Sequence, residues 1–479
     1  MELLYATLQS GLASLASYLA AHVLLCLVPA FFVAGALSAL VPQQSVTRFL
    51  GPDAPKWIAY PAAAGAGSLL AVCSCTVQPL FAGIYSKGAG LGPGITFLFF
   101  APAANILALS YTGVALGADF ALARVVLSLC FGIGIGMIMA LLFHRDDAAR
   151  LANAGAFTGG QGIGGRPAAF LIALIALLIA GTLKLDFLTV RLVIFDATLP
   201  AAVSVQELLD RLIPVNAIKG DEGLSVQGVA LIVMLALIGT SALRGFGKVD
   251  EGYNPMTKLT LGLIAATLIL ATLGMQASGN GLRVAITGRS LAVAALLAVL
   301  VPLARRFDAW DMQQWLWETW RFVRQIFPLL IVGVFLVGVI RVFIRPEWIQ
   351  AVAGANTVTG NLAGVAFGIF MYFPTLVEVP IAKMFLSLGM HPGPLIAYLM
   401  ADPELSLQSI LITSAIVGKL KAWTYVGLVA LFSTAAGLAY GAWVDGAPAA
   451  AIALGIAVFV GTLITALHFI DKHHLPKAA

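Results

Sequence analysis

Residues 67–88, GSLLAVCSCTVQPLFAGIYSKG, decide how this chain folds. The stretch is apolar enough for a transmembrane helix, but Pro79 and a run of thiol and small polar side chains lie at its centre. Proline inside a helix removes a backbone donor and clashes with the preceding turn. In a membrane, such a break survives only where protein or water satisfies the freed backbone groups. The stretch therefore predicts a broken helix within a helical membrane protein.

The composition of the whole chain agrees with a membrane protein. Of its 479 residues, 60% are hydrophobic and 10% are charged, whereas soluble domains carry roughly 25% charged residues. The net charge is +5, and the basic residues lie in short loops between apolar stretches. This arrangement favours membrane lipids over nucleic acid as the partner. We expect an all-α integral membrane protein, a polytopic bundle of about 11 to 13 segments.

Two kinds of apolar stretch make up the expected bundle. Uninterrupted stretches of the required length, about 20 residues, lie near 15–41, 119–143, 167–184, 225–242, 257–274, 288–304, 322–344, 422–443 and 448–470. Stretches broken by Pro, Gly or polar residues lie near 57–84, 93–116, 351–389 and 394–418. We expect helices at all of these, with the breaks at functional places.

The chain also matches itself at an offset of 301 residues. The matches are Gly67 with Gly368, Pro79 with Pro380, Gly88 with Gly389, Gly92 with Gly393 and Pro102 with Pro403, and Pro29 matches Pro328 at nearly the same offset. Chance in a glycine-rich chain is the alternative to a duplicated four-segment unit near 15–145 and 320–445. Broken segments at matched places in two halves are the best sequence indication of a transporter's binding site. We expect the halves to run parallel, although the number of intervening crossings decides this.

The repeat predicts an organisation in four parts. These are a first repeat (1–150), middle transmembrane helices with an external loop (151–310), a second repeat (311–447), and a final helix and tail (448–479). Basic residues cluster in alternate loops: Arg145, Arg150 and Arg166, then Arg244, Lys248 and Lys258, then Arg305, Arg306 and Arg321. By the positive-inside rule these loops are cytoplasmic, which places loop 184–224 outside. We expect a multi-pass protein of the cell (inner) membrane with a cytoplasmic N-terminus and no cleaved signal peptide.

A Cys-x-Cys motif precedes Pro79. In extended backbone Cys73 and Cys75 share a side, so an unwound stretch here makes a two-thiol clamp for a soft ion. Ser74, Thr76 and Gln78 then satisfy the loosened backbone. The alternative is that buried cysteines are small hydrophobic side chains, which fits the separate Cys26 and Cys130 best. His22 lies one turn from Cys26 and is a further ligand candidate, although packing is the commoner role for a lone histidine.

The matching stretch of the second half, FGIFMYFPTLVEVPIAKMFLSLG (367–389), offers Thr375, Glu378 and Lys383 instead of thiols. An ionisable group inside a span is expensive and is by default a functional candidate. We expect Glu378 to be a proton carrier or a cation partner, with Lys383 holding its charge. A purely structural pairing of the two is the alternative.

Polar residues also flank the second pair of matched prolines. Asn105 follows Pro102, while Asp402 and Glu404 flank Pro403. They are expected either to line the site or to cap helices, and we count Asp402 as a further candidate for coupling transport to protons.

Three blocks resemble a known family. AVCSCTVQPLFAGIYSKGAGLGPGITFLFFAPAANILAL (71–109), PTLVEVPIAKMFLSLGMHPGPLIAYLMADPELSL (374–407) and GKLKAWTYVGLVALFSTAAGLAYG (418–441) are similar to the predicted permeases that include the ArsP-like organoarsenical efflux permeases. The resemblance covers about half of the chain and implies that Cys73 and Cys75 bind a trivalent arsenical or another thiophilic species. It further implies proton-coupled secondary efflux, and two thiols suit a methylated arsenical better than inorganic arsenite.

Two other classes of function stay open from the residues. A membrane thiol oxidoreductase would cycle Cys73 and Cys75 between dithiol and disulfide, although one intervening residue strains such a bond. A scaffold is disfavoured because paired broken helices cost stability. The sequence contains no P-loop, zincin motif or nucleophile elbow. We therefore expect a transporter rather than an enzyme, with no cofactor, and the sequence allows a homo-oligomer.

Overall fold

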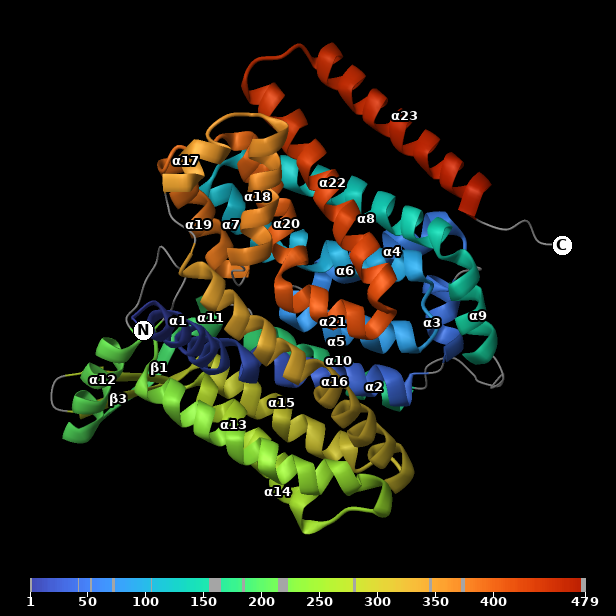
Figure 1. The fold of residues 1–479 in the computed structure, drawn as a ribbon. Coiled ribbons are helices and arrows are strands. Elements are labelled where there is room, and N and C mark those ends of the chain that lie inside the picture. Colours follow the sequence, from blue (N-terminus) through green and yellow to red (C-terminus); the bar gives the residue numbers. More distant parts are fainter. Residues whose placement is uncertain are drawn as a thin grey trace.

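The fold is an assembly of helices, and seven of the nine uninterrupted stretches contain a helix long and apolar enough to span a membrane, whereas 288–304 and 448–470 form shorter apolar helices in the part that the structure describes. The computed structural model describes residues 2–41, 43–51, 54–70, 74–104, 106–154, 165–182, 186–213, 223–278, 281–343, 347–371 and 375–474. Within these, seven helices are long and apolar enough to cross a membrane, or eight if a bent pair counts as one span. Each of the nine uninterrupted stretches coincides with a helix, which confirms the all-α polytopic fold (Figure 1).

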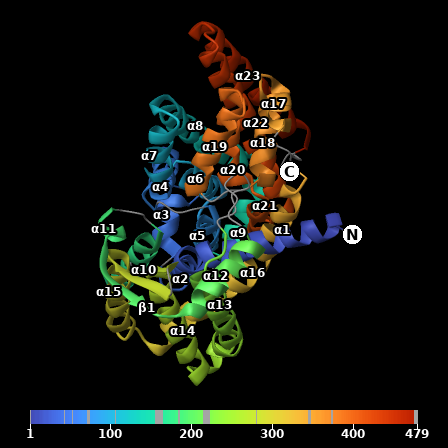
Figure 2. The ribbon, with the colours of Figure 1, turned by 90° about the vertical axis from the view of Figure 1, so that its left-hand side faces the viewer.

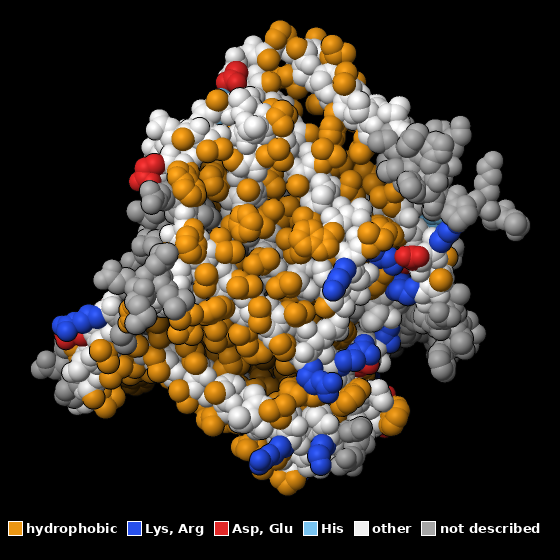
Figure 3. Space-filling model, viewed as in Figure 1, with side chains coloured by type: hydrophobic (Ala, Val, Ile, Leu, Met, Phe, Trp, Pro, Cys, Tyr) orange, Lys and Arg blue, Asp and Glu red, His pale blue; other side chains and the backbone are white. Residues whose placement is uncertain are grey.

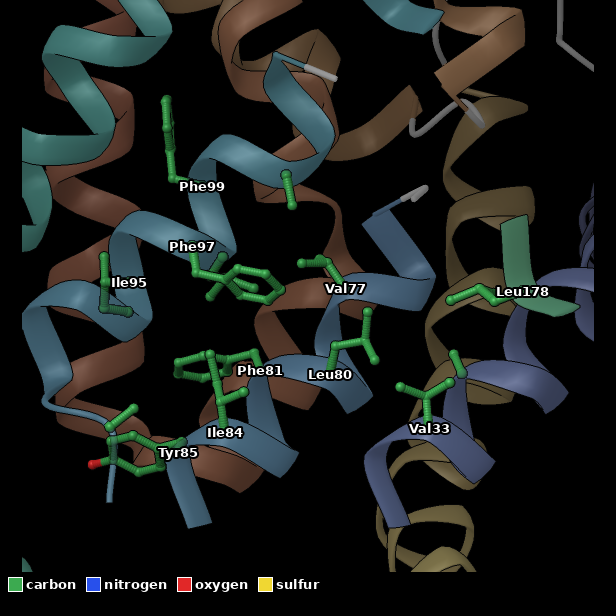
Figure 4. Packing of buried hydrophobic residues seen from close by; sticks show 14 of the residues in the cluster. Val33, Val77, Leu80, Phe81, Ile84, Tyr85, Ile95, Phe97, Phe99 and Leu178 are labelled. Carbon is green, nitrogen blue, oxygen red and sulfur yellow. The ribbon is translucent and has the colours of Figure 1, made fainter. Parts of the chain in front are cut away.

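The first part of the chain forms the elements α1 (Glu2–Tyr18), the π-helical η1 (Leu19–Leu27), α2 (Val28–Leu40), α3 (Gln43–Leu50), α4 (Lys56–Leu70), α5 (Ser74–Ser86), α6 (Leu91–Ala103), α7 (Ile106–Ala115), α8 (Ala118–Leu142) and α9 (His144–Ala154). Its core lies where α5 packs on α6 and α2. There Phe81 stacks on Tyr85 with ring centroids 5.5 Å apart, and Figure 4 shows Phe81 facing Phe97 of α6, with Val33 of α2 on the other side of Leu80. Every residue of α6 is buried, so this short helix is enclosed by protein.

The middle part forms α10 (Gly165–Thr182), α11 (Asp186–Thr189), β1 (Arg191–Ala197), α12 (Pro200–Leu212), α13 (Val226–Gly245), the 3-10 helix η2 (Phe246–Glu251), α14 (Pro255–Thr272), β2 (Gly274–Ser278), β3 (Gly281–Thr287) and α15 (Gly288–Ala304). The three strands form an antiparallel sheet in the order β1-β3-β2, which was not predicted from the sequence. The sheet joins the ends of the middle helices and contains an exposed ion pair between Arg283 and Asp196, with 2.8 Å between the charged atoms.

The last part forms α16 (Ala309–Arg341), α17 (Glu347–Ala353), α18 (Val358–Met371), α19 (Thr375–Ser387), α20 (Pro392–Leu405), α21 (Leu407–Val417), α22 (Lys419–Val444) and α23 (Ala449–His474). In Figure 2, α4–α8 and α18–α22 stand side by side, and α10 with α13–α15 forms a layer beneath both. Large apolar side chains such as Leu122 and Ile172 are 66% exposed on spans. Hydrophobic side chains cover the middle of the face in Figure 3, while most Lys and Arg side chains gather at its lower right, as a surface in contact with lipid requires.

The helices of the two matched regions correspond one to one. Helices α5, α6, α7 and α8 begin at residues 74, 91, 106 and 118, and α19, α20, α21 and α22 begin 301 residues later in each case. Glycines with positive φ stand at matching turns: Gly88 (+91°) with Gly389 (+88°), and Gly117 (+111°) with Gly418 (+93°). This correspondence supports the duplicated unit that we propose from the sequence.

Corresponding helices run in opposite directions, so the expectation of parallel halves is wrong. Along the contact between α8 and α22, Phe120 meets Tyr440 and Phe131 meets Phe432, both at 5.1 Å between ring centroids. Lys421, at the start of α22, lies over the ring of Phe143, just past the end of α8. The two helices are therefore antiparallel.

The physical reason is that α4 and α5 do not cross the bundle. Lys56, at the start of α4, lines the same cavity as Asp147 of α9. Arg150 of α9 donates a 2.6 Å hydrogen bond to the carbonyl of Tyr85, near the end of α5. Both ends of the α4–α5 hairpin thus lie at the same side of the bundle, and a re-entrant hairpin changes the count of crossings on which the direction of the halves depends.

The first helices place the N-terminal segment beside the middle loop. Ser17 donates a 3.1 Å hydrogen bond to the carbonyl of Gly223, while Ser38 donates to Glu318 of α16 at 3.0 Å. The N-terminal segment therefore lies at the end of the bundle where loop 184–224 lies. The loop 184–224 was predicted to be external and the N-terminus to be cytoplasmic. Since both lie at the same end of the bundle, the two predictions cannot both be right.

Candidate functional site

The two halves meet through their broken segments. Helix α19 packs on α7, α21 packs on α5, and α20 packs on α6. Each half thus contributes its re-entrant hairpin to the broken span of the other half. Helices α20 and α21 follow each other across a bend of 48°. Polar side chains gather at these breaks, and we take the region as the candidate site.

Arg124 of α8 and Glu378 of α19 form a buried ion pair between the halves. Their charged atoms lie 2.8 Å apart, and both side chains are 0% exposed. The Nε atom of Arg124 donates to the carbonyl of Ala103, the last residue of α6, at 2.8 Å. A second nitrogen donates to the hydroxyl of Thr112 at 3.2 Å. Arg124 therefore satisfies backbone at the break between α6 and α7 while it neutralises a carboxylate from the other half.

In the second half, the contact between Glu404 and Tyr425 corresponds to the contact between Ala103 and Arg124 in the first half. The Tyr425 hydroxyl donates a 2.7 Å hydrogen bond to Glu404, and both side chains are buried. At the offset of 301, Tyr425 corresponds to Arg124 and Glu404 corresponds to Ala103. The contact thus joins α6 to α8 in the first half and α20 to α22 in the second half. In the first half a guanidinium donates to a backbone carbonyl, whereas in the second half a hydroxyl donates to a carboxyl group.

Asp402 is buried within α20. It is 0% exposed, while Ser406 caps α21 by accepting a hydrogen bond from the backbone of Ser409. Asp402 is therefore not the N-cap of α20 or α21, and the residue stays a candidate for the site.

The thiol motif lies only partly within the described residues. Cys73 and Asn105 lie outside them, and so do the side chains of Ser74, Cys75 and Thr375, although Ser74 begins α5 and Thr375 begins α19. The described residues contain no cluster of three His, Cys, Asp or Glu side chains that would hold a metal. The metal-binding role of Cys73 and Cys75 stays a prediction.

Thr76 and Gln78 differ from the expectation. Both lie within α5, as does Pro79, because the helix begins at Ser74. Their side chains are buried and bridge helices: Thr76 bonds to the thiol of Cys26 in η1, and Gln78 accepts a 3.1 Å hydrogen bond from Thr413 of α21. From Ser74 onward the backbone ahead of Pro79 is helical, so within the described residues no unwound stretch separates Cys75 from Pro79.

Lys383 is not the partner of Glu378, and this expectation is wrong. Lys383 is exposed on α19, whereas Glu378 is fully buried and pairs with Arg124. Arg124, Thr112 and Tyr425 were not predicted from the sequence. Arg124 carried a usable signal, because it is the single basic residue inside the span predicted near 119–143 and an intramembrane charge is a functional candidate by default.

The comparisons with known proteins agree with a membrane transporter. Residues 9–442 match the family described as "Predicted permease". The chain is 32% identical over 422 residues to UPF0718 protein MJ0584 of Methanocaldococcus jannaschii, a match that covers 88% of this chain and 92% of that protein. No solved structure matches the chain.

Proposed function

Because the chain belongs to the predicted permease family, we propose that it is a secondary transporter that exports a thiophilic substrate. The substrate class is a trivalent organoarsenical or a soft metal ion, and the site is the cell (inner) membrane. The substrate follows from Cys73 and Cys75, since soft thiolates prefer soft ions.

The buried pair of Arg124 and Glu378 is the observation that carries this proposal. It lies between two oppositely directed halves, at the ends of broken helices. Secondary transporters built from inverted repeats bind substrate and coupling ions at such places. Charges inside a membrane protein are costly, and they usually mark ion pathways or proton relays. A charge pair that joins moving parts is therefore suited to coupling.

In the proposed cycle, Cys73 and Cys75 hold the substrate, with Ser74, Thr76, Gln78, Asn105 and Thr375 lining its path. Protonation of Glu378 removes its negative charge and breaks the ion pair with Arg124. Helix α19 then moves relative to α8, and release of the proton on the other side restores the pair. Asp402, buried on the neighbouring α20, contributes to the same charge balance.

Uptake by everted membrane vesicles tests this function. We expect proton-driven accumulation of methylarsenite, or of Cu⁺ or Zn²⁺ in the same panel, by vesicles that contain the protein. Cys73→Ser and Cys75→Ser should abolish it. Cys130→Ser is the matched control, because Cys130 is exposed on α8. Transport of every species at the wild-type rate by both serine variants would refute the thiol mechanism.

A further inference from the structure

Glu404 is a second buried carboxyl group in the same cluster. Its side chain is 3% exposed. One carboxyl oxygen, Oε2, accepts the hydrogen bond from Tyr425. The other, Oε1, has no hydrogen-bond partner among the residues that the structure describes. The cycle proposed above gives Glu404 no role, yet a buried carboxyl group within a span requires an explanation.

Among the described residues, the cation that acts on Glu404 is Arg124, which is already paired with Glu378. Helix α20 packs against α6, α8, α18, α19, α21 and α22. The titratable side chains that act on Glu404 from these elements, within the described ranges, are Arg124, Glu378 and Tyr425, and Asp402 lies on α20 itself. Arg124 pairs directly with Glu378 at 2.8 Å. Glu404 therefore lacks a cation of its own in this part of the structure.

Charge balance links the two glutamates. An ionised carboxylate without a counter-ion in an apolar interior costs several kcal/mol, and in practice such a group takes up a proton instead. Glu404 is therefore neutral while Arg124 is paired with Glu378. If Glu378 loses its charge, Arg124 becomes the unpaired ion, and ionisation of Glu404, on which the charge of Arg124 acts, would restore a counter-charge.

We propose that Glu404 is a second proton-carrying residue, which holds a proton while Glu378 is ionised and releases it when Glu378 is protonated. One proton leaves Glu404 for each proton that Glu378 binds, so the cluster keeps one carboxylate beside Arg124 throughout. The inference rests on the proposed transport function for its role, because a proton moves between two carboxyl groups within the coupling site.

Infrared spectroscopy of the purified protein in nanodiscs tests the inference without any substrate. At pH 7 the difference between wild type and Glu404→Gln should contain the C=O band of a protonated carboxylic acid. The difference between Glu378→Gln and the double variant Glu378→Gln/Glu404→Gln should lack this band, because Glu404 is ionised there. Glu347→Gln, at the exposed start of α17, is the control and should leave the band unchanged.

Either of two results would overturn the inference: no acid band in the first difference, or an acid band in the second. Glutamine has the shape of neutral glutamic acid, so Glu404→Gln should give the same monodisperse elution as wild type. Its aggregation would count against a neutral Glu404. If the vesicles show no transport but the infrared bands are as expected, the proposed transport function is wrong and the shared proton site is supported. If the vesicles transport but the infrared bands are not as expected, the shared proton site is wrong and the transport function is supported.

Discussion

Replacing Arg124 with methionine should destabilise the protein by about 3–5 kcal/mol, the cost of removing one partner of a buried ion pair. The change leaves Glu378 without a counter-ion and removes the donor to the carbonyl of Ala103. Hydrogen bonds between membrane helices contribute only about 0.6 kcal/mol on average. A loss of the larger size therefore identifies the unpaired carboxylate, rather than the lost hydrogen bonds, as the main cause.

The double variant Arg124→Met/Glu378→Met separates these causes further. It removes both charges, and apolar replacement of a buried pair is often neutral or stabilising, so most of the lost stability should return. Equilibrium unfolding in bicelles by titration with sodium dodecyl sulfate measures all four members of the cycle. A single Arg124→Met variant within about 1 kcal/mol of wild type would refute the reasoning, and so would an additive double variant. The recovered double variant should be folded but inactive in proton-driven transport.

Three further predictions test the fold. Gly437→Ala should cost about 1–3 kcal/mol, because an added Cβ would overlap an asparagine side chain of α18, whereas Gly427→Ala on the same helix meets nothing within 4 Å and should be neutral in the same unfolding assay. Burial lowers the pKa of Lys87 in the turn after α5, so the folded state binds fewer protons than the unfolded chain as pH approaches 10.5 and wild-type stability rises with pH there. Lys87→Met should therefore be more stable than wild type at pH 7, and this difference in the free energy of unfolding should shrink toward pH 10.5. A difference that does not change with pH would contradict the lowered pKa of Lys87. Single cysteines at Tyr5 and at Arg150 should react with an impermeant maleimide from opposite sides of intact cells, and labelling from one side would overturn the N-terminal placement.

The parts of the fold that depend on composition were predictable from the sequence. A span shows itself as about 20 apolar residues, and Pro403 lies just before the bend between α20 and α21, whereas Pro79 lies inside the helix α5. The direction of the halves was not predictable, because it depends on whether a hairpin such as α4–α5 crosses the bundle. That is decided by tertiary contacts such as the one from Arg150 to Tyr85.

The candidate site was predictable only in part. Glu378 was identified because a carboxylate in an apolar stretch is conspicuous. Its partner was not, since Arg124 lies more than 250 residues earlier and nothing local links the two. Lys383 was chosen for its closeness in sequence, but it lies on the exposed side of α19. The thiol site and the four-part organisation of the chain stay proposals.

The contact between Phe131 and Phe432 has a consequence for any motion of the two halves. The two residues occupy the same position of α8 and α22, and their rings meet edge to face at 75°. A residue that touches its own counterpart lies on the pseudo-twofold axis, where rotation of one half against the other produces the least displacement. We therefore expect this aromatic pair to be displaced least when the halves rotate against each other. A change in its size should alter the opening of both faces of the membrane equally, whereas a change at Tyr425, whose hydroxyl bonds to Glu404 within the second half, acts on one half alone.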